Sequence, residues 1–312
     1  MTQRYEEGVP ENLRVLSEHT FDLKFPLWMQ NFGENFADIK EGKNLATLQN
    51  EHDGLPAIVI GAGYPVFQLN HLNMLKKANP KAVIIATDKM LKPCLDKGIS
   101  PTYVTTIDGD PQIAAFFANR KAMKWTKEGT VIINVMAHPI TAKTIKGKKY
   151  WFISMIDDPF NKRSITAALH FIAKIVITHT LGNVGGFSWN LAYFLGCNPI
   201  ALIGMPFSYP ENTPFEKSIY YDSFLKTLKE NKRAQSEITA FFRKDYNEFF
   251  NNYSLSDIIW DSYACVFSNY IDKAYEQHKL RTINCTGAGI LHPPRVKNIQ
   301  SMHFKDFLKM IK

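Results

Sequence analysis

The pattern of apolar and polar positions divides the chain into three stretches. Residues 1–50 place large apolar side chains at helical spacing and predict an N-terminal helical extension. Residues 51–211 alternate short apolar runs with amphipathic stretches, which predicts strands and helices in turn. Residues 212–312 are again amphipathic and predict a helical region, with one helix over the phenylalanine-rich segment 241–250, before a strand within 282–290 returns to the core.

This alternation is typical of right-handed βαβ units on a mostly parallel sheet. We therefore expect an α/β fold, in which a mostly parallel sheet is flanked by helices and carries helical additions at its N- and C-terminal ends. Neither end has enough apolar residues for a separate core, so both additions should pack against the sheet and its helices. Trp28 and the phenylalanines near 241–250 are expected to belong to the core.

Composition narrows the function classes. The chain has 312 residues, of which 45% are hydrophobic and 21% charged, and this is typical of a soluble globular protein. The formal net charge is +8, with lysines spread along the sequence. Such a surplus suits an anionic ligand, for example a nucleotide or a sugar phosphate. Dense Lys/Arg clusters are missing, so no specific nucleic-acid partner is expected.

Cysteines and apolar runs indicate the compartment. The four cysteines are far apart and form no Cys-x-x-Cys pair, which favours reduced thiols inside a cell. The N-terminus lacks an apolar signal sequence. The longest apolar stretch is interrupted by Lys174 and His179 and is too short to cross a membrane. We expect a cytoplasmic protein with no transmembrane segment. The oligomeric state stays open.

A glycine turn follows the first buried apolar run, in "PAIVIGAGYP". Gly61 and Gly63 permit positive φ or a close approach of the backbone to another group, which in α/β proteins is often a phosphate. A third glycine at the dinucleotide spacing is missing because Val66 stands there, so an NAD site is not expected. A tight strand-to-helix turn without a ligand is an equal alternative.

Polar residues follow several of the expected strands. In an open parallel sheet, ligands bind beyond the carboxyl ends of the strands, and five such ends carry polar or glycine residues. Gly, Asp and Asn are also common in turns, so each could be structural alone. The five ends are Gly61-Ala62-Gly63, Thr87-Asp88, Asp108-Gly109-Asp110, Asn134 with His138, and Gly204 with Ser208 and Tyr209.

The segment "TTIDGDP" is the candidate metal site. Asp108 and Asp110 could both face one small volume and hold Mg²⁺ together with the phosphates of a substrate. Asp110 also precedes Pro111, so it is more simply explained as a helix cap. His138 is a candidate catalytic acid or base, although a lone histidine is more often structural.

A second glycine-rich segment, "TLGNVGGFSWN", opens a predicted helix. Asn183, Gly185, Gly186 and Ser188 lie where free N–H groups and the helix dipole favour an anion. The Gly-Lys-Ser/Thr of a P-loop is missing, so ATP binding of that kind is not expected. Close packing of the helix on the sheet is the alternative explanation.

The ordered blocks "PAIVIGAG", "KAVIIATDKMLKPCLDKGISPTYVTTIDGDP", "GNVGGFSWNLAYFLGCNPIALIGMPFSY" and "INCTGAG" resemble the archaeal 6-hydroxymethylpterin diphosphokinase (MptE-like) family. That family includes the central domain of the motility-accessory-factor (Maf) glycosyltransferases, which modify flagellin with sialic-acid-like sugars. The similarity spans about residues 28–290 and implies a Rossmann-like fold with a nucleotide at the glycine turn. The implied nucleotide-binding residues are Gly61, Ala62, Gly63, Tyr64, Thr87, Asp88, Asn183, Gly185, Gly186, Ser188, Gly204, Tyr209, Thr286 and Gly287.

The resemblance implies a nucleotide-dependent transferase with Mg²⁺, which moves a diphosphate or a sugar group from a nucleotide donor to a small-molecule or surface-glycan acceptor. "IDGDP" resembles the diphosphokinases, whereas "WMQNFGEN", the region after residue 211 and "INCTGAG" resemble the glycosyltransferases. Tyr64-Pro65 replaces the family's usual Pro-Ser, Pro206 replaces an acidic residue, and a histidine of the glycosyltransferases is missing. A nucleotide-binding module with impaired catalysis is therefore the alternative.

Overall fold

The computed structural model describes residues 11–293 and 295–312. Within them, ten strands form one sheet in the order β1-β6-β5-β4-β3-β2-β8-β12-β13, with β7 paired to β6. Every pair is parallel. The strands are β1 (Lys43–Asn44), β2 (Ala57–Ile60), β3 (Val83–Thr87), β4 (Tyr103–Thr106), β5 (Thr130–Asn134), β6 (Lys148–Ser154), β7 (Ile177–Thr178), β8 (Ile200–Ile203), β12 (Thr282–Asn284) and β13 (Ile299–Ser301).

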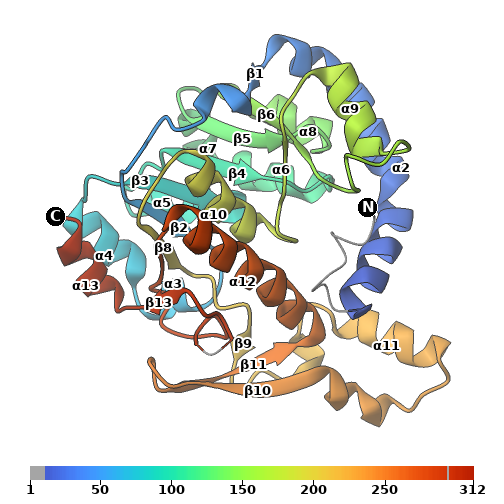
Figure 1. Ribbon diagram of the computed structural model, residues 1–312, viewed down its shortest axis with the longest axis vertical. Coiled ribbons are helices and arrows are strands. Elements are labelled where there is room, and N and C mark those ends of the chain that lie inside the picture. The colour runs from blue at the N-terminus through green and yellow to red at the C-terminus, as the bar shows by residue number, and fades with distance from the viewer. Residues whose placement is uncertain (1–10, 294) are drawn as a thin grey trace.

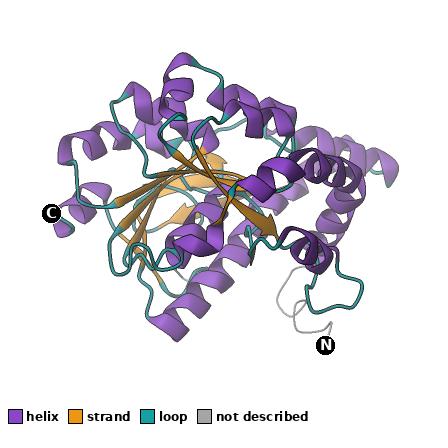
Figure 2. Ribbon diagram, turned by 90° about the horizontal axis from the view of Figure 1, so that it is seen from above, coloured by secondary structure: helices purple, strands orange, loops and turns teal. Residues whose placement is uncertain are grey.

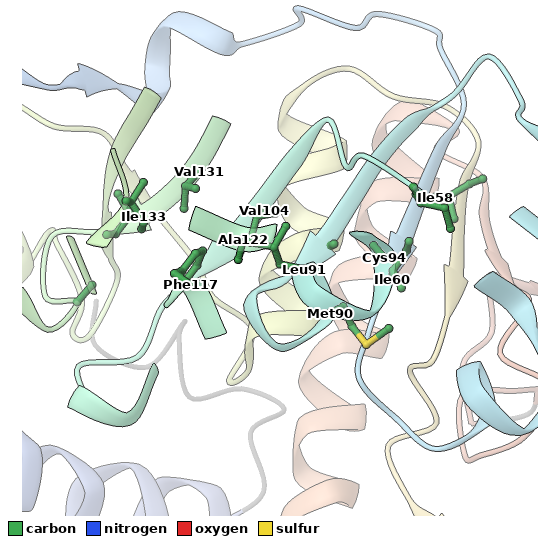
Figure 3. Close-up of a cluster of buried hydrophobic side chains, with 14 of the residues drawn as sticks. Ile58, Ile60, Met90, Leu91, Cys94, Val104, Phe117, Ala122, Val131 and Ile133 are labelled. Carbon is green, nitrogen blue, oxygen red and sulfur yellow. The ribbon is translucent and has the colours of Figure 1, made fainter. Parts of the chain in front are cut away.

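The central strands are continuous apolar runs because helices cover both faces of the sheet. All four residues of β2 are buried. Ile58 and Ile60 point into the core on one face, which Figure 3 shows together with Leu91. Ala57 and Val59 point into the core on the other face. The predicted α/β fold with a Rossmann-like, mostly parallel sheet is confirmed.

Two layers of helices enclose the sheet (Figure 2). One layer packs on the core that contains Ile58; its helices are α2 (Glu11–Glu41), α3 (Pro65–Gln68), α4 (His71–Ala78), α5 (Leu91–Asp96), α6 (Ala114–Phe117), α7 (Arg120–Trp125), α8 (Pro139–Thr144), α9 (Ile165–Ala173) and α13 (Phe304–Met310). The opposite layer contains α10 (Val184–Phe194) and α12 (Ile258–His278). Residues 1–10 of the predicted N-terminal extension lie outside the described residues.

Residues 209–257 form a lobe below the sheet in Figure 1. The lobe has its own small apolar core, with Phe224 and Leu228 at its centre. Its elements are the antiparallel strands β9 (Tyr209–Pro210), β10 (Phe242–Asn247) and β11 (Asn252–Asp257), the helix α11 (Tyr221–Glu230), and the 3₁₀ turns η4 (Phe215–Lys217) and η5 (Gln235–Phe241).

The predicted helix over residues 241–250 is wrong, because β10 occupies this segment and forms a hairpin with β11. Asparagines at the hairpin end explain the difference. Asn247 accepts a hydrogen bond from the Phe250 N–H at 3.1 Å, and Asn251 adopts a left-handed φ of 51°, which asparagine tolerates well. No helix among the described residues is long and apolar enough to traverse a lipid bilayer.

Candidate functional site

The sheet reverses its strand order between β2 and β8. From β2 the chain builds β3, β4, β5 and β6 on one side, and then crosses to place β8 and β12 on the other side. A crevice opens beyond the carboxyl ends of the strands at such a topological switch point, and ligands of open α/β sheets bind there. One strand-end region lies at this point and a second lies beside it, at the ends of β3 and β4. They differ in chemistry and are described in turn.

The glycine junction, which comprises Gly61, Gly63, Gly204 and Pro206, joins the ends of β2 and β8. The Gly61 N–H donates to the Ile203 carbonyl and the Gly63 N–H donates to the Gly204 carbonyl, both at 2.9 Å. A Cβ on Gly61 or Gly63 would overlap the Gly204 carbonyl, and one on Gly63 would also overlap the Pro206 ring. Gly204 itself has a φ of +65°. These glycines allow two loops to touch, and both N–H groups are bonded within the protein.

The loop after β12 closes the glycine junction from its other side. The Thr286 hydroxyl accepts from the Met205 N–H at 3.3 Å and is fully buried. Gly287 has a φ of +87° and packs against Leu69. The Tyr64 hydroxyl lies 3.3 Å from Ser254 Oγ of β11. Thr286, Gly287 and Tyr64 therefore connect the loops, whereas Ala62 is half-buried on the turn.

Helix α10 begins on the same edge of the sheet. The Asn183 side chain caps it by accepting from the Gly186 N–H at 2.9 Å. Gly185 packs against Met205, and Gly186 packs against Leu181. Ser188 is fully buried; its hydroxyl lies 2.7 Å from Thr105 Oγ1 and donates to the Val184 carbonyl. The helix is thus held against the sheet by small residues, as the packing explanation predicted.

The acidic edge, which comprises Thr87, Asp88, Thr106 and Asp108, lies at the ends of the neighbouring strands β3 and β4. The side chains of Thr87, Asp88 and Thr106 are buried, with exposed fractions of 3% or less. Three of their polar atoms have no hydrogen-bond partner among the described residues, namely Thr87 Oγ1, Asp88 Oδ2 and Thr106 Oγ1. The Nδ2 atom of Asn183 is buried and unpartnered in the same way.

Asp88 has the most perturbed carboxylate of this edge. Burial raises its pKa to about 7, and the nearby Asp108 adds to the rise. Its Oδ1 accepts from the Lys89 N–H at 2.7 Å, which opposes the rise. The Thr106 hydroxyl lies close enough to favour the ionised form, yet neither Oδ2 nor Oγ1 reaches hydrogen-bonding geometry. A positive ligand would stabilise this carboxylate.

Asp108 and Asp110 differ in what they do. Asp110 caps the short turn η3 (Pro111–Ile113) by accepting from the Gln112 N–H at 3.0 Å, so its expected capping role is confirmed. The Asp108 side chain reaches solvent, but surrounding protein removes part of its hydration and, with Asp110, raises its pKa. Lys24 of α2 is the nearby cation that lowers it. Asp108 is therefore the carboxylate of this loop that can face a ligand.

His138 stands at the start of α8. Its Nδ1 accepts from the Ile140 N–H at 3.2 Å and caps that helix. Asn134 is the buried last residue of β5, and its amide donates to the Ile107 carbonyl at 3.1 Å. Both residues hold loops in place, and a catalytic role for His138 stays a prediction.

Further residues of this part of the protein come from the lobe and from helix α12. Tyr209 is buried in β9, where its hydroxyl donates to Asp257 Oδ2 at 2.7 Å, so it anchors the lobe. Tyr263 of α12 packs against Gly182 just before α10. Burial raises the pKa of Tyr263, and the negative charge of Asp108 adds to the rise. No periodic pattern or motif predicted a role for Tyr263 or Lys24, because each lies far along the chain from Asp108.

The architecture and the position of this edge define the class of Rossmann-like α/β proteins. The sequence profile of the family described as 6-hydroxymethylpterin diphosphokinase MptE-like matches residues 30–212. Because this match spans more than half of the chain, the protein belongs to that family, and the resemblance noted in the sequence is confirmed. No curated protein matches the sequence.

A solved structure supports the same fold. The Maf glycosyltransferase from Magnetospirillum magneticum AMB-1 is similar, with a TM-score of 0.55 and 13% sequence identity. The match covers 86% of this chain and 39% of that chain, so this chain spans about two-fifths of the length of that structure. At this identity the likeness shows the fold.

Proposed function

We propose that the protein is a nucleotide-dependent transferase whose donor binds with its phosphates over the acidic edge. The observation that carries this proposal is the group of buried polar atoms without partners: Thr87 Oγ1, Asp88 Oδ2, Thr106 Oγ1 and Asn183 Nδ2. Buried polar atoms are normally paired, because an unpaired one costs about 1–3 kcal/mol. A ligand with several hydrogen-bonding groups would pair them. Thr87, Asp88 and Thr106 lie at the carboxyl ends of β3 and β4, one and two strands from the topological switch point, on the edge where open α/β sheets bind nucleotides.

Asp88 and Asp108 fit Mg²⁺ better than the expected pair of Asp108 and Asp110. Asp110 is used as a cap, whereas Asp88 has an unpartnered oxygen and interacts electrostatically with Asp108. Among the described residues, no group of three His, Cys, Asp or Glu side chains could hold a metal. Phosphate oxygens and water would therefore complete the coordination, as is usual for Mg²⁺. When bound, the ion would neutralise charge on the donor phosphates.

We favour sugar transfer over diphosphate transfer. The likeness to the Maf glycosyltransferase covers 86% of the chain and so extends beyond residues 30–212, which match the MptE-like family. The acceptor would be a glycan or a small hydroxyl compound, next to the lobe. Diphosphate transfer to a pterin is the second candidate, because the family description names that activity. Cytoplasm, where nucleotide donors are made, would be the site of either reaction.

Pro206 supports a third, non-catalytic alternative. It takes the place of the acidic residue that the family usually has there, and its carbonyl accepts from the Ile290 N–H at 2.9 Å. Its ring packs on Gly63, so this position serves the junction between loops. A protein that binds the nucleotide tightly and turns over no donor would support a binding module.

Ligand-induced stabilisation tests the shared part of the proposal. The melting temperature is measured with CMP, CTP, ATP and GTP at millimolar concentration, with and without Mg²⁺. A shift that needs Mg²⁺ is expected for at least one nucleotide, and no shift with any of them would contradict the proposal. Release of CMP from a CMP-activated sugar would then favour sugar transfer, whereas formation of AMP from ATP with 6-hydroxymethylpterin would favour diphosphate transfer.

A further inference from the structure

Helix α2 lies across the loops that follow β4 and β5. Asn31 and Asn35, one turn apart on this helix, point their amides into the protein and are 1% and 3% exposed. The Asn31 amide donates to the Gly109 carbonyl at 3.0 Å and to the Met136 carbonyl at 3.1 Å. It therefore bridges the Asp108 loop and the loop after β5.

The Asn35 amide also donates to two carbonyls, but both belong to the loop after β5. It donates to the Val135 carbonyl at 3.2 Å and to the Ala137 carbonyl at 2.7 Å. Carbonyls beyond the strand ends have no ladder partner, and a buried carbonyl needs a donor. Each asparagine thus donates to two buried carbonyls. Only Asn31 also holds the Asp108 loop, through the Gly109 carbonyl.

Packing at Gly109 makes the same connection more rigid. A Cβ on Gly109 would lie 3.0 Å from the Asn31 amide nitrogen, from Trp28 Cδ1 and from the Met136 carbonyl oxygen. The space beside Gly109 is therefore filled by side chains of α2 and by the loop after β5. Gly109 lets the loop press against the helix, so that the neighbouring Asp108 extends from a fixed backbone.

We infer that Asn31 is a positioning residue, which fixes the loop from which Asp108 reaches the donor. The expected effect of Asn31 on turnover rests on the proposed function, whereas its hold on the loop does not. Misplacement of a reacting or charge-stabilising group by about 1 Å can cost roughly a hundredfold in rate. Loss of the Asn31 amide should therefore reduce turnover and weaken the use of Mg²⁺, although Asn31 touches neither the donor nor the metal.

The test compares Asn31→Leu with Asn35→Leu. Leucine matches the shape of asparagine and cannot donate, so each variant loses two hydrogen bonds at an equally buried site. Both variants should lose similar stability in a thermal melt. Asn31→Leu should lower kcat by about tenfold or more and raise the Mg²⁺ concentration for half-maximal turnover, whereas Asn35→Leu should change that concentration less than about twofold. Asn31→Ser, which can still donate once, replaces Asn31→Leu if the latter does not fold.

Hydrogen exchange of the peptide that covers residues 107–113 separates this inference from the proposed function. Exchange there should be faster in the Asn31 variant than in wild type, and unchanged in Asn35→Leu. If the wild type turns over no donor, the proposed function fails and the exchange result still decides whether Asn31 holds the loop. Equal exchange at 107–113 in both variants, or parallel losses of turnover and Mg²⁺ use in both, would overturn the inference.

Discussion

The glycine junction and the acidic edge lie side by side on one sheet, and their polar groups are used in opposite ways. At the glycine junction, the N–H groups of Gly61 and Gly63 donate to carbonyls at the end of β8, and no side chain fits between the loops. At the acidic edge, buried oxygens of Thr87, Asp88 and Thr106 have no partner among the described residues.

The difference separates residues that join the loops to one another from residues that have unused hydrogen-bonding capacity. A glycine-rich turn in a sequence suggests a phosphate site because phosphates often bind such turns. Here the glycines are explained by the contact between two loops, and the unmet hydrogen-bonding capacity lies one and two strands away. Substitutions in the two regions should therefore fail differently, the first through folding and the second through activity.

The largest effect is expected at Asp108. Asp108→Asn keeps the size of the side chain but removes the charge that a metal or a positive ligand needs, so turnover should fall by about tenfold to a thousandfold. The melting temperature should hardly change. Asp110→Asn is the matched control, two residues away; asparagine caps about as well as aspartate, so its turnover should stay within about threefold. Full activity in Asp108→Asn would remove this residue from the site.

Gly61→Ala should damage folding. Its methyl group would overlap the Gly204 carbonyl and crowd Met205, and overpacking of this kind costs on the order of 1–3 kcal/mol or more. The melting temperature should fall by roughly 5 °C or more. Gly33→Ala is the control, because a Cβ there meets nothing within 4 Å. If Gly61→Ala kept normal stability but no longer bound nucleotide, the glycine junction would be a binding site and not only a contact between loops.

Asp88 should make stability depend on pH. Its folded pKa of about 7 lies above that of an unfolded aspartate, about 3.9, so between these values the folded state holds a proton that the unfolded state lacks. Raising the pH through this window therefore destabilises the fold. The Asp88→Asn side chain never ionises. The stability of this variant relative to wild type should therefore rise between pH 4 and pH 7 and stay constant at higher pH. Melting curves at pH 5 and pH 8 measure this; an equal difference at both would contradict the raised pKa.

The smallest effect is expected at Lys24, which acts on Asp108 from α2. It is exposed, so its charge is screened. Lys24→Met should weaken nucleotide binding by about two- to fivefold, and added salt should reduce the difference. Lys40→Met, at the other end of α2, is the control. Identical affinities for the two variants would show that Lys24 does not contribute.

Local patterns predicted the central strands, because β2, β3, β5, β6 and β8 are largely buried apolar runs. They also predicted the edge that carries Asp88 and Asp108, since the carboxyl ends of parallel strands share one side. The role of Gly61 was not predictable. Its contact with Gly204 joins residues far apart in sequence, and the pattern of a phosphate turn is the same as that of a loop contact.

Local sequence patterns could not predict the β10–β11 hairpin or the contact of Asn31, for different reasons. The β10–β11 hairpin lies in a segment rich in charged and aromatic residues, which suits a helix or an edge strand equally, and tertiary packing decided between them. Asn31 lies within the segment "WMQNFGEN", but its contact with Gly109 was not predictable because the two residues lie 78 positions apart. Only the folded arrangement reveals which loop its amide holds.

The lobe enters and leaves the rest of the protein at one place. Tyr209 pairs with Leu255, and the Tyr209 hydroxyl reaches Asp257 at the start of α12. A segment whose two ends are adjacent can be lengthened, shortened or exchanged without moving the strands on either side. Changes to α11 could therefore be accommodated within the lobe. Strand β11, in contrast, is tied to the glycine junction, because Ser254 contacts the Tyr64 hydroxyl and Asn252 donates to the Gly287 carbonyl.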